Sequence, residues 1–269
     1  MKLAMFAAGV LAAAVALSAT MVPARADQYE DIMKSGKLRV ATDFAVPPFG
    51  MLDAALQPTG LDVESAKLLA ADWGLKLEWV KTTGASRIPN LLSNKADVVM
   101  SSLSITPDRA EVIDFSKPYG VINSVIGGKA DDKISSWEDL KGRNVAVARG
   151  TINDTDITAV AAKYGFTITR YEDDATLITA ILSGQNDLIA HATETLKRIN
   201  EKNPALHFEP KVVTRASGIG IGVRKGNPVL VQKLNEWVDA NMANGKLNAL
   251  SVKFTGIPLP QKMPTMPSK

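Results

Sequence analysis

The sequence contains no cysteine and only two histidines in 269 residues. Without disulfides, an exported form of the chain depends on its hydrophobic core for stability. Zinc and iron sites draw mainly on cysteine and histidine, so we expect no metal site and no other cofactor. Aromatic residues are few, at 6%, but 46% of the residues are hydrophobic, which is enough for packed cores.

A strong charge of either sign is absent as well. The 31 basic and 28 acidic residues leave a net charge of +3. Nucleic acids and anionic membrane surfaces attract proteins with a pronounced basic field. We therefore expect neither as a partner.

Long apolar runs are also missing, except at the N-terminus. Lys2 precedes an apolar, alanine-rich run over residues 3–20, and Ala24-Arg25-Ala26 matches a leader-peptidase site. The run is about as long as a short membrane anchor, but its small residues and the cleavage motif favour a cleaved leader. We predict a signal peptide over 1–26, a mature chain from Asp27 with a net charge of +1, and a periplasmic location.

The mature chain alternates apolar strands with helical stripes, in two successive sets. The pattern predicts parallel sheets covered by helices on both faces. In the first set, strands are expected over 38–41, 75–79 and 97–100, and helices over 63–74 and 88–93. In the second set, strands are expected over 144–148, 166–170 and 187–190, and helices over 157–165, 177–184 and 193–202.

Two extended segments, 119–127 and 217–223, connect the two sets, and helices over 227–244 and 246–254 then return to the first. We therefore predict an α/β protein of two lobes with mainly parallel sheets, joined by a two-strand hinge. Lobe one would comprise 27–122 and 218–269, and lobe two would comprise 123–217.

The segment from Ser101 to Arg109 carries the most chemistry. It follows a strand and opens a helix, with Thr106 suited to the N-cap and Pro107 to the first helical position. Free N–H groups, serine hydroxyls and the guanidinium of Arg109 meet near the positive end of the helix dipole, which suits a carboxylate. The alternative is an ordinary strand-to-helix turn with a surface arginine.

The chain resembles the extracytoplasmic solute-binding proteins of polar amino-acid ABC transporters (family 3 type), whose fold is that of the type II periplasmic binding proteins. The resemblance rests on the order and spacing of these segments: 36–43 (GKLRVATD), 47–49 (PPF), 60–64 (GLDVE), 87–92 (RIPNLL), 97–109 (DVVMSSLSITPDR), 114–119 (DFSKPY), 139–142 (DLKG) and 149–151 (RGT).

The resemblance implies a ligand bound between two closing lobes. In that family the arginine matching Arg109 pairs with the ligand's α-carboxylate, and the N–H of the residue matching Thr151 binds the same group. The positions matching Ser102 and Ser104 face the α-ammonium. Asp43 matches a position that often reads the ligand side chain, although a loop aspartate can also cap local N–H groups.

Further residues belong to the candidate ligand site. Arg87 matches an arginine that lines the pocket or braces its loops, and a salt bridge within lobe one is the alternative. The remaining candidates are Ser101, Arg149, Asn153 and His191. For His191 the alternative is a strand-end histidine bonded to backbone, and for the nearby Asp174 it is a helix N-cap before Ala175.

Two departures from the family pattern concern the ligand. The aspartate that usually pairs with the α-ammonium is replaced by Ala192, and an unpaired ammonium in a closed cleft would be costly. Val46 and Gly84 stand where aromatic residues often hold the ligand side chain, so the space at Gly84 predicts a broader ligand. Asp43 or another acid then takes the ammonium, or the ligand has none.

The leading hypothesis is a monomeric, non-enzymatic receptor that binds an amino acid or related small carboxylate and docks on a membrane permease. An alternative is a periplasmic cyclohexadienyl-type dehydratase, with Glu194 or Asp174 as its general acid. Another is a receptor for a carboxylate without an α-amino group. A sensory domain would need a membrane helix and a signalling module in the same chain.

Overall fold

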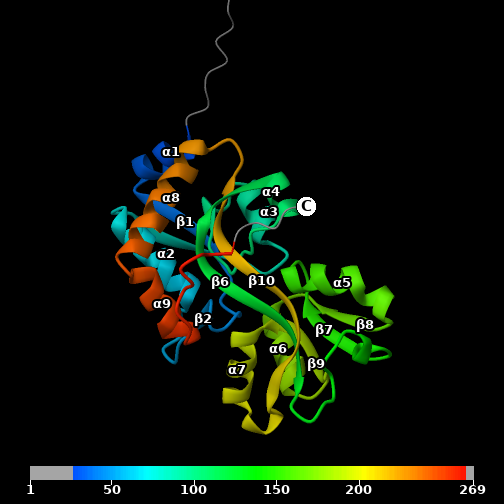
Figure 1. Ribbon diagram of the computed structural model, residues 1–269. Helices are drawn as coiled ribbons and strands as arrows, with labels where there is room; N and C mark the ends of the chain where they lie inside the picture. The colour runs from blue at the N-terminus through cyan, green and yellow to red at the C-terminus, as the bar shows by residue number, and fades with distance from the viewer. Residues whose placement is uncertain (1–26, 265–269) are drawn as a thin grey trace, which may run out of the picture.

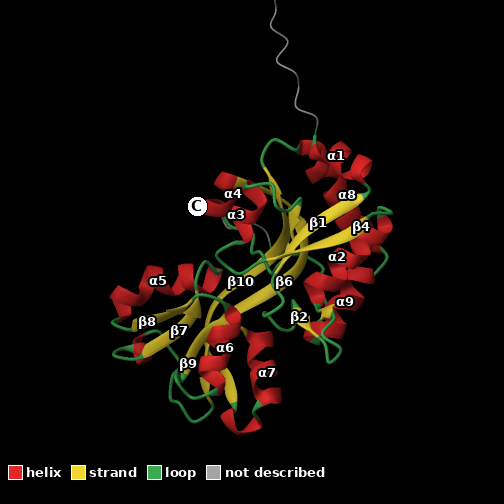
Figure 2. Ribbon diagram, turned by 180° about the vertical axis from the view of Figure 1, so that it is seen from behind, coloured by secondary structure: helices red, strands yellow, loops and turns green. Residues whose placement is uncertain are grey.

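The computed structural model describes residues 27–264, which form two lobes connected by two long strands (Figures 1 and 2). The predicted signal peptide, 1–26, lies outside the described residues. Among the described residues, no helix is long and apolar enough to cross a membrane.

Lobe one contains the predicted strand–helix alternation, together with three further elements. Its elements are α1 (Gln28–Ser35), β1 (Lys37–Thr42), β2 (Met51–Leu52), β3 (Pro58–Thr59), α2 (Leu61–Asp72), β4 (Lys76–Lys81), α3 (Arg87–Leu92), β5 (Val98–Val99) and α4 (Pro107–Val112). The three that the sequence did not predict are α1, β2 and β3. After lobe two the chain returns to it through α8 (Pro228–Ala243) and α9 (Lys246–Thr255).

Lobe two repeats the alternation between the two long strands, β6 (Ile113–Lys129) and β10 (Phe208–Arg224). Its elements are η1 (Glu138–Leu140), β7 (Asn144–Ala148), α5 (Ile152–Tyr164), β8 (Thr167–Tyr171), α6 (Asp174–Leu182), β9 (Leu188–Ala192), α7 (Thr193–Lys202) and η2 (Pro204–Leu206).

The main sheet has the strand order β4-β1-β5-β10-β6-β9-β7-β8. Within each lobe the short strands are parallel: β1 pairs with β4 and β5, and β7 pairs with β8 and β9. The long strands β6 and β10 are antiparallel to one another and run from one lobe into the other (Figure 1). The predicted α/β fold with a two-strand connection is therefore confirmed, and the predicted lobe boundaries fall inside β6 and β10.

Alternation along the strands buries both faces of each lobe's sheet. In β7, Val145 and Val147 join one apolar cluster with Ile157 of α5, while Ala146 and Ala148 join another with Leu177 of α6. Successive side chains on a strand point to opposite faces, so each lobe has two packed layers of helices. This packing holds the carboxyl ends of the parallel strands toward the other lobe.

Local signals set the helix starts near the site. Thr106 caps α4 by accepting a bond from the Arg109 N–H, and Pro107 occupies the first turn, as predicted. Asp173 caps α6 by accepting the Thr176 N–H. The interpretation of Asp174 as the cap is therefore wrong, because Asp174 lies inside the helix and is buried.

Candidate ligand site between the lobes

A small cavity lies where the two lobes meet. Its lining comes from both lobes: Asp43, Val46, Gly84, Arg87, Ser101, Ser102, Ile122, Thr151, Ile152, Asn153, Asp174 and His191. Its volume is about 20 Å³, room for about one water. The lobes are therefore closed on one another, and a larger ligand requires them to part.

Asp43 follows β1 and presents one free carboxylate oxygen to this cavity. Its N–H donates to Ser101 Oγ (3.0 Å), and its Oδ1 accepts the Ala45 N–H (2.9 Å). Its Oδ2 is buried without a hydrogen-bond partner. Burial, with the nearby charge of Asp174, raises the pKa of Asp43 from 3.8 to about 6. A donor or cation in the cavity would satisfy this oxygen.

Arg87 lines the cavity and also braces loops of both lobes. Its Nη1 donates to Ser101 O (2.7 Å), its Nε to Gly84 O (3.2 Å) and its Nη2 to Gly150 O (3.2 Å). Burial lowers its pKa, and the carboxylates of Asp174 and Asp43 oppose that shift. The sequence left open a salt bridge within lobe one for Arg87. In the structure, Arg87 instead donates to backbone carbonyls.

The loop from Ser101 to Ser104, here called the serine loop, is held in shape by Asp62, to which the sequence assigned no role. Ser102 has a left-handed backbone with φ 42, which is uncommon for a residue other than glycine. Its N–H donates to Asp62 Oδ2 (2.6 Å), and Tyr119 donates its hydroxyl to Asp62 Oδ1 (2.7 Å). Asp62 lies in the segment 60–64 that carries the family resemblance, but it shares the first turn of α2 with Glu64, and nothing in the sequence assigned it a role. Burial raises its pKa to about 6.

Three predicted site residues do not line the cavity: Ser104, Arg109 and Arg149. Arg109 donates from Nη1 to Ser104 O (3.0 Å) and from Nη2 to Gly150 O (3.3 Å). Arg109 and Arg87 therefore both donate to the carbonyl of Gly150 in lobe two. Burial and the neighbouring Arg87 charge lower the pKa of Arg109 to about 9. Arg149 extends to the surface and pairs with Glu172 (2.7 Å).

Lobe two contributes the start of α5 and the end of β9. Thr151 caps α5 by accepting the Asp154 N–H (3.2 Å). In the first turn of α5, the Oδ1 of Asn153 is buried without a hydrogen-bond partner. His191 Nδ1 accepts the Ala192 N–H (2.8 Å), so Nε2 faces Asp174 Oδ1 (2.9 Å) as a donor. The backbone bond expected for His191 is present, together with a buried carboxylate partner.

The structure changes the interpretation of Gly84. A Cβ at this position would lie 2.7 Å from Arg149 O and 3.0 Å from Thr151 Cγ2. Lobe two therefore fills the space that we assigned to a broad ligand, and that assignment is wrong for the closed arrangement. Ala192 does not line the cavity, and it packs in the apolar cluster that contains two lining residues, Val46 and Ile122.

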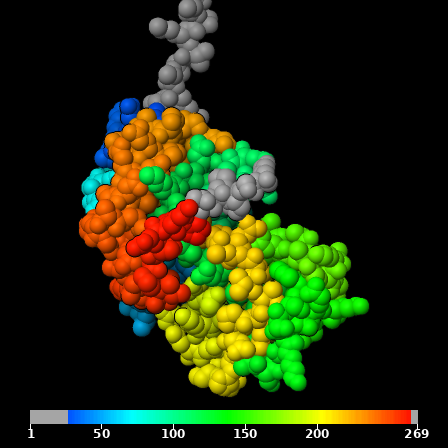
Figure 3. Space-filling view, in the orientation of Figure 1, coloured from blue at the N-terminus to red at the C-terminus, as the bar shows by residue number. Residues whose placement is uncertain are grey.

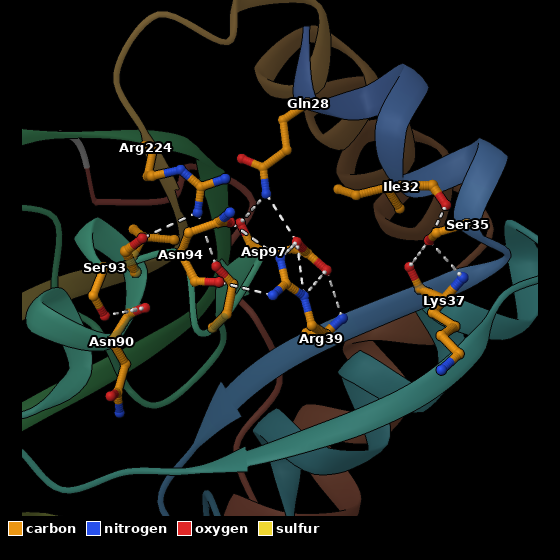
Figure 4. A network of polar contacts seen from close by, with 12 residues as sticks. Gln28, Ile32, Ser35, Lys37, Arg39, Asn90, Ser93, Asn94, Asp97 and Arg224 are labelled. Atoms are coloured by element: carbon orange, nitrogen blue, oxygen red, sulfur yellow. Dashed lines mark hydrogen bonds and ion pairs between the residues drawn. The ribbon is translucent and has the colours of Figure 1, made fainter.

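A larger cavity of about 610 Å³ lies in lobe one beside α1, the start of β1 and the segment before α8, away from the cleft. Figure 4 shows its polar network, in which Gln28 and Arg39 both bond to Asp97. Other charges there are also paired, as in Lys37–Glu78 and Lys225–Asp114. The Oε1 of Gln28 is buried there without a partner, but the charges of this larger cavity are paired within lobe one. The inter-lobe cavity is the stronger ligand site, because both lobes line it and it contains the unpartnered charged oxygen of Asp43.

Comparison with known proteins identifies the family. The model for bacterial extracellular solute-binding proteins, family 3, matches residues 38–257. The chain belongs to this family. The resemblance found in the sequence segments is thereby confirmed.

Three relatives illustrate the similarity. A "Probable histidine-binding protein" from Neisseria gonorrhoeae is 30% identical over 252 residues, covering 91% of this chain and 94% of its own. The L-cystine-binding protein TcyJ of Escherichia coli (strain K12) is 29% identical, covering 90% of this chain and 92% of its own. A solved ancestral amino acid-binding protein, a precursor of cyclohexadienyl dehydratase, has a TM-score of 0.77 and 34% identity, covering 85% of this chain and 99% of its own.

Proposed function

We propose that the chain is the ligand-binding receptor of an amino-acid ABC importer, and that its ligand lies between the lobes with a carboxylate at the arginines and one cation at Asp43. The observation that carries this is the pair of buried, unpartnered oxygens, Asp43 Oδ2 and Asn153 Oδ1, in a cavity that Arg87 also lines. Ligand names of the relatives support the class, since histidine and L-cystine are both amino acids.

The arginines offer the carboxylate end of the site. In the closed arrangement both Arg87 and Arg109 donate to the carbonyl of Gly150. When the lobes part, this carbonyl leaves with lobe two and frees donors on both guanidiniums. A ligand carboxylate then takes those donors, and a charge-assisted bond is stronger than the carbonyl bond it replaces.

The position of the cation follows from the missing aspartate. Ala192 offers no charge, and Asp174 is already bonded to His191. Among the cavity-lining carboxylates this leaves Asp43, with Asn153 Oδ1 as a second acceptor. A single cation suits this pair better than the two cations of lysine or arginine.

Binding rather than catalysis is the better account of the cavity. The dehydratase alternative needs a general acid over the leaving group. Glu194 does not line this cavity, and Asp174 is held by His191. The relatives reported above are binding proteins, and one of them is a precursor of a dehydratase.

A thermal-shift screen with amino acids, their keto and hydroxy analogues, amines and opines tests the proposal. A ligand at a hundred times its dissociation constant stabilises the protein by about 2.7 kcal/mol. We expect stabilisation by acids with one carboxylate and one cation, weak effects of lysine and arginine, and no product from prephenate or arogenate. Product formation, or binding of amines without a carboxylate, would contradict the proposal.

The same family membership supports a periplasmic receptor that works as a monomer and delivers its ligand to an inner-membrane permease. Lobe closure is the step that prepares it, because a ligand with higher affinity for the closed form shifts the population toward that form. Co-purification with the permease in the presence and absence of ligand tests this partner.

A further inference from the structure

The chain after α9 forms a strap across the outside of the hinge. This C-terminal strap, residues 257–264, leaves lobe one and passes over β6 and β10 (Figures 1 and 3). Its first half is fixed to lobe one, because Ser251 Oγ donates to Ile257 O (2.7 Å) and the Leu259 N–H donates to Asn248 Oδ1 (2.9 Å). Leu259 also packs against the core of lobe one.

The strap lies on the opposite side of the hinge from the ligand cavity. Ile122 of β6 lines the ligand cavity, whereas its neighbours Val121 and Asn123 line a second cavity beneath the strap. Successive side chains on a strand point to opposite faces. The strap therefore covers the back of the strands that connect the lobes.

The far end of the strap touches the hinge beside two of the four register shifts in the β6–β10 pairing. The β6–β10 register shifts between Ile219 and Gly220 and again between Gly220 and Gly222. Just before these shifts, a Cβ on Gly218 would lie 2.8 Å from Pro264 O. The strap thus lies in close backbone contact beside an irregular segment of the hinge, where the ladder is locally disrupted.

Lobe two forms one wall of the cavity beneath the strap. This cavity holds about 370 Å³, and Glu194 of α7 lines it together with Lys262 and Pro260 of the strap. Glu194 is 3% exposed, and its Oε2 has no hydrogen-bond partner. The strap is therefore anchored in lobe one and faces lobe two across a gap.

We propose that the C-terminal strap is a brace behind the hinge that limits how far the lobes open. When the lobes rotate apart at the ligand cavity, the surfaces behind the hinge approach one another. The strap occupies that space, so wide opening must press it against the wall containing Glu194 or displace it from Gly218. The inference depends on the two-lobe fold and not on the identity of the ligand.

A chain ending at Pro260 tests the proposal, because it keeps the anchors at Ile257 and Leu259. The sequence has no natural cysteine, so Ser93→Cys in lobe one and Ala162→Cys in lobe two, both exposed, accept spin labels selectively. Electron–electron distances are measured without ligand in the full and shortened chains. We expect the shortened chain to populate longer distances that the full chain lacks.

Two controls sharpen the result. Thermal melting should show that the shortened chain stays folded, and a flexible Gly-Ser tail in place of 261–269 should behave like the truncation. Amide exchange in the hinge residues 119–123 should be faster in the shortened chain. Unchanged distance distributions, or wild-type distances restored by the Gly-Ser tail, would overturn the assignment of a brace to these residues.

Discussion

At the scale of single residues, the site is made of buried charged groups that lie close enough to shift one another's pKa. Arg87 is satisfied by carbonyls, while Asp43 keeps one oxygen without a partner. Asp62 is buried behind the serine loop and bonds to Ser102 and Tyr119. The proposed ligand would exchange existing bonds at the arginines and supply a new one at Asp43.

Arg109→Ala tests the carboxylate end of the site. If the arginine pairs with the ligand in a closed cleft, we expect binding to weaken by about 2 to 5 kcal/mol, measured by titration calorimetry with a ligand from the screen. Arg149→Ala is the matched control, because Arg149 is 48% exposed and pairs with Glu172 at the surface. Equal effects of the two substitutions would remove Arg109 from the site.

The pKa of Asp43 predicts how affinity depends on pH. The pKa of this carboxyl is raised to about 6, and a cationic ligand binds its ionised form. Affinity should therefore fall as pH drops through 6, by up to about tenfold per pH unit below the pKa. Calorimetry from pH 5 to 8 measures this, and Asp43→Asn should weaken binding and flatten the profile. A wild-type profile without slope would contradict a cation at Asp43.

The raised pKa of Asp43 also affects the stability of the ligand-free protein, but in the opposite direction: low pH weakens ligand binding and favours the folded state. Because the pKa is higher in the folded chain than its ordinary value of 3.8, the folded state holds more protons between pH 4 and 6. The contribution of Asp43 to stability is therefore present at acidic pH and lost as pH rises through about 6. On the proposed function, the ligand's cation would offset that loss.

At the scale of elements, the site lies where loops at the carboxyl ends of parallel strands meet across the cleft. The loop at Gly84 after β4 approaches the loop from Arg149 to Thr151 after β7 within atomic contact. Neither loop has room for an added side chain there. This contact makes closure sensitive to one methyl group on either side.

Gly84→Ala tests this contact. The backbone at Gly84 is not left-handed, but its new Cβ would lie 2.7 Å from Arg149 O. We expect the substitution to oppose closure and weaken binding at least tenfold, about 1.4 kcal/mol. Gly142→Ala is a suitable control, since its φ of +73 strains the fold while its Cβ would meet nothing within 4 Å. Similar affinities for both variants would contradict the role of Gly84.

At the scale of the whole molecule, β6 and β10 connect the two lobes, which also touch across the cleft. The cross-cleft bonds include Arg87 to Gly150 and Thr195 Oγ1 to Pro47 O (2.7 Å). These bonds are few compared with the packed cores of the separate lobes. Opening therefore breaks these polar contacts and also moves Ala192 of lobe two relative to the apolar cluster of lobe one in which it packs.

Small-angle scattering with and without ligand tests this behaviour. Because the ligand favours the closed form, its addition should reduce the radius of gyration of a population that includes open molecules. The forward-scattering intensity from the same experiment reports the mass and should correspond to a monomer. A radius that stays constant on saturation would count against ligand-driven closure.

The sequence alone determined the fold class and the loops that carry the site. Periodicity of two and of 3.6 residues is a local property, and it located the parallel strands and most of the helices, although it missed α1, β2 and β3. Strand order then placed Asp43, Ser101, Ser102 and Thr151 at carboxyl ends of strands, and the cavity brings them together. Thr106 and Pro107 predicted the start of α4 for the same local reason.

Only the tertiary structure decided what each side chain faces. Asp62 is remote in sequence from Ser102, and only folding brings its carboxylate to that N–H. The space beside Gly84 belongs to lobe two, which no pattern in lobe one can reveal. Residues 257–264 likewise show no periodicity, and their place behind the hinge follows from the direction in which α9 ends (Figure 1). Contacts between distant segments depend on the packing of whole elements, and local patterns do not encode it.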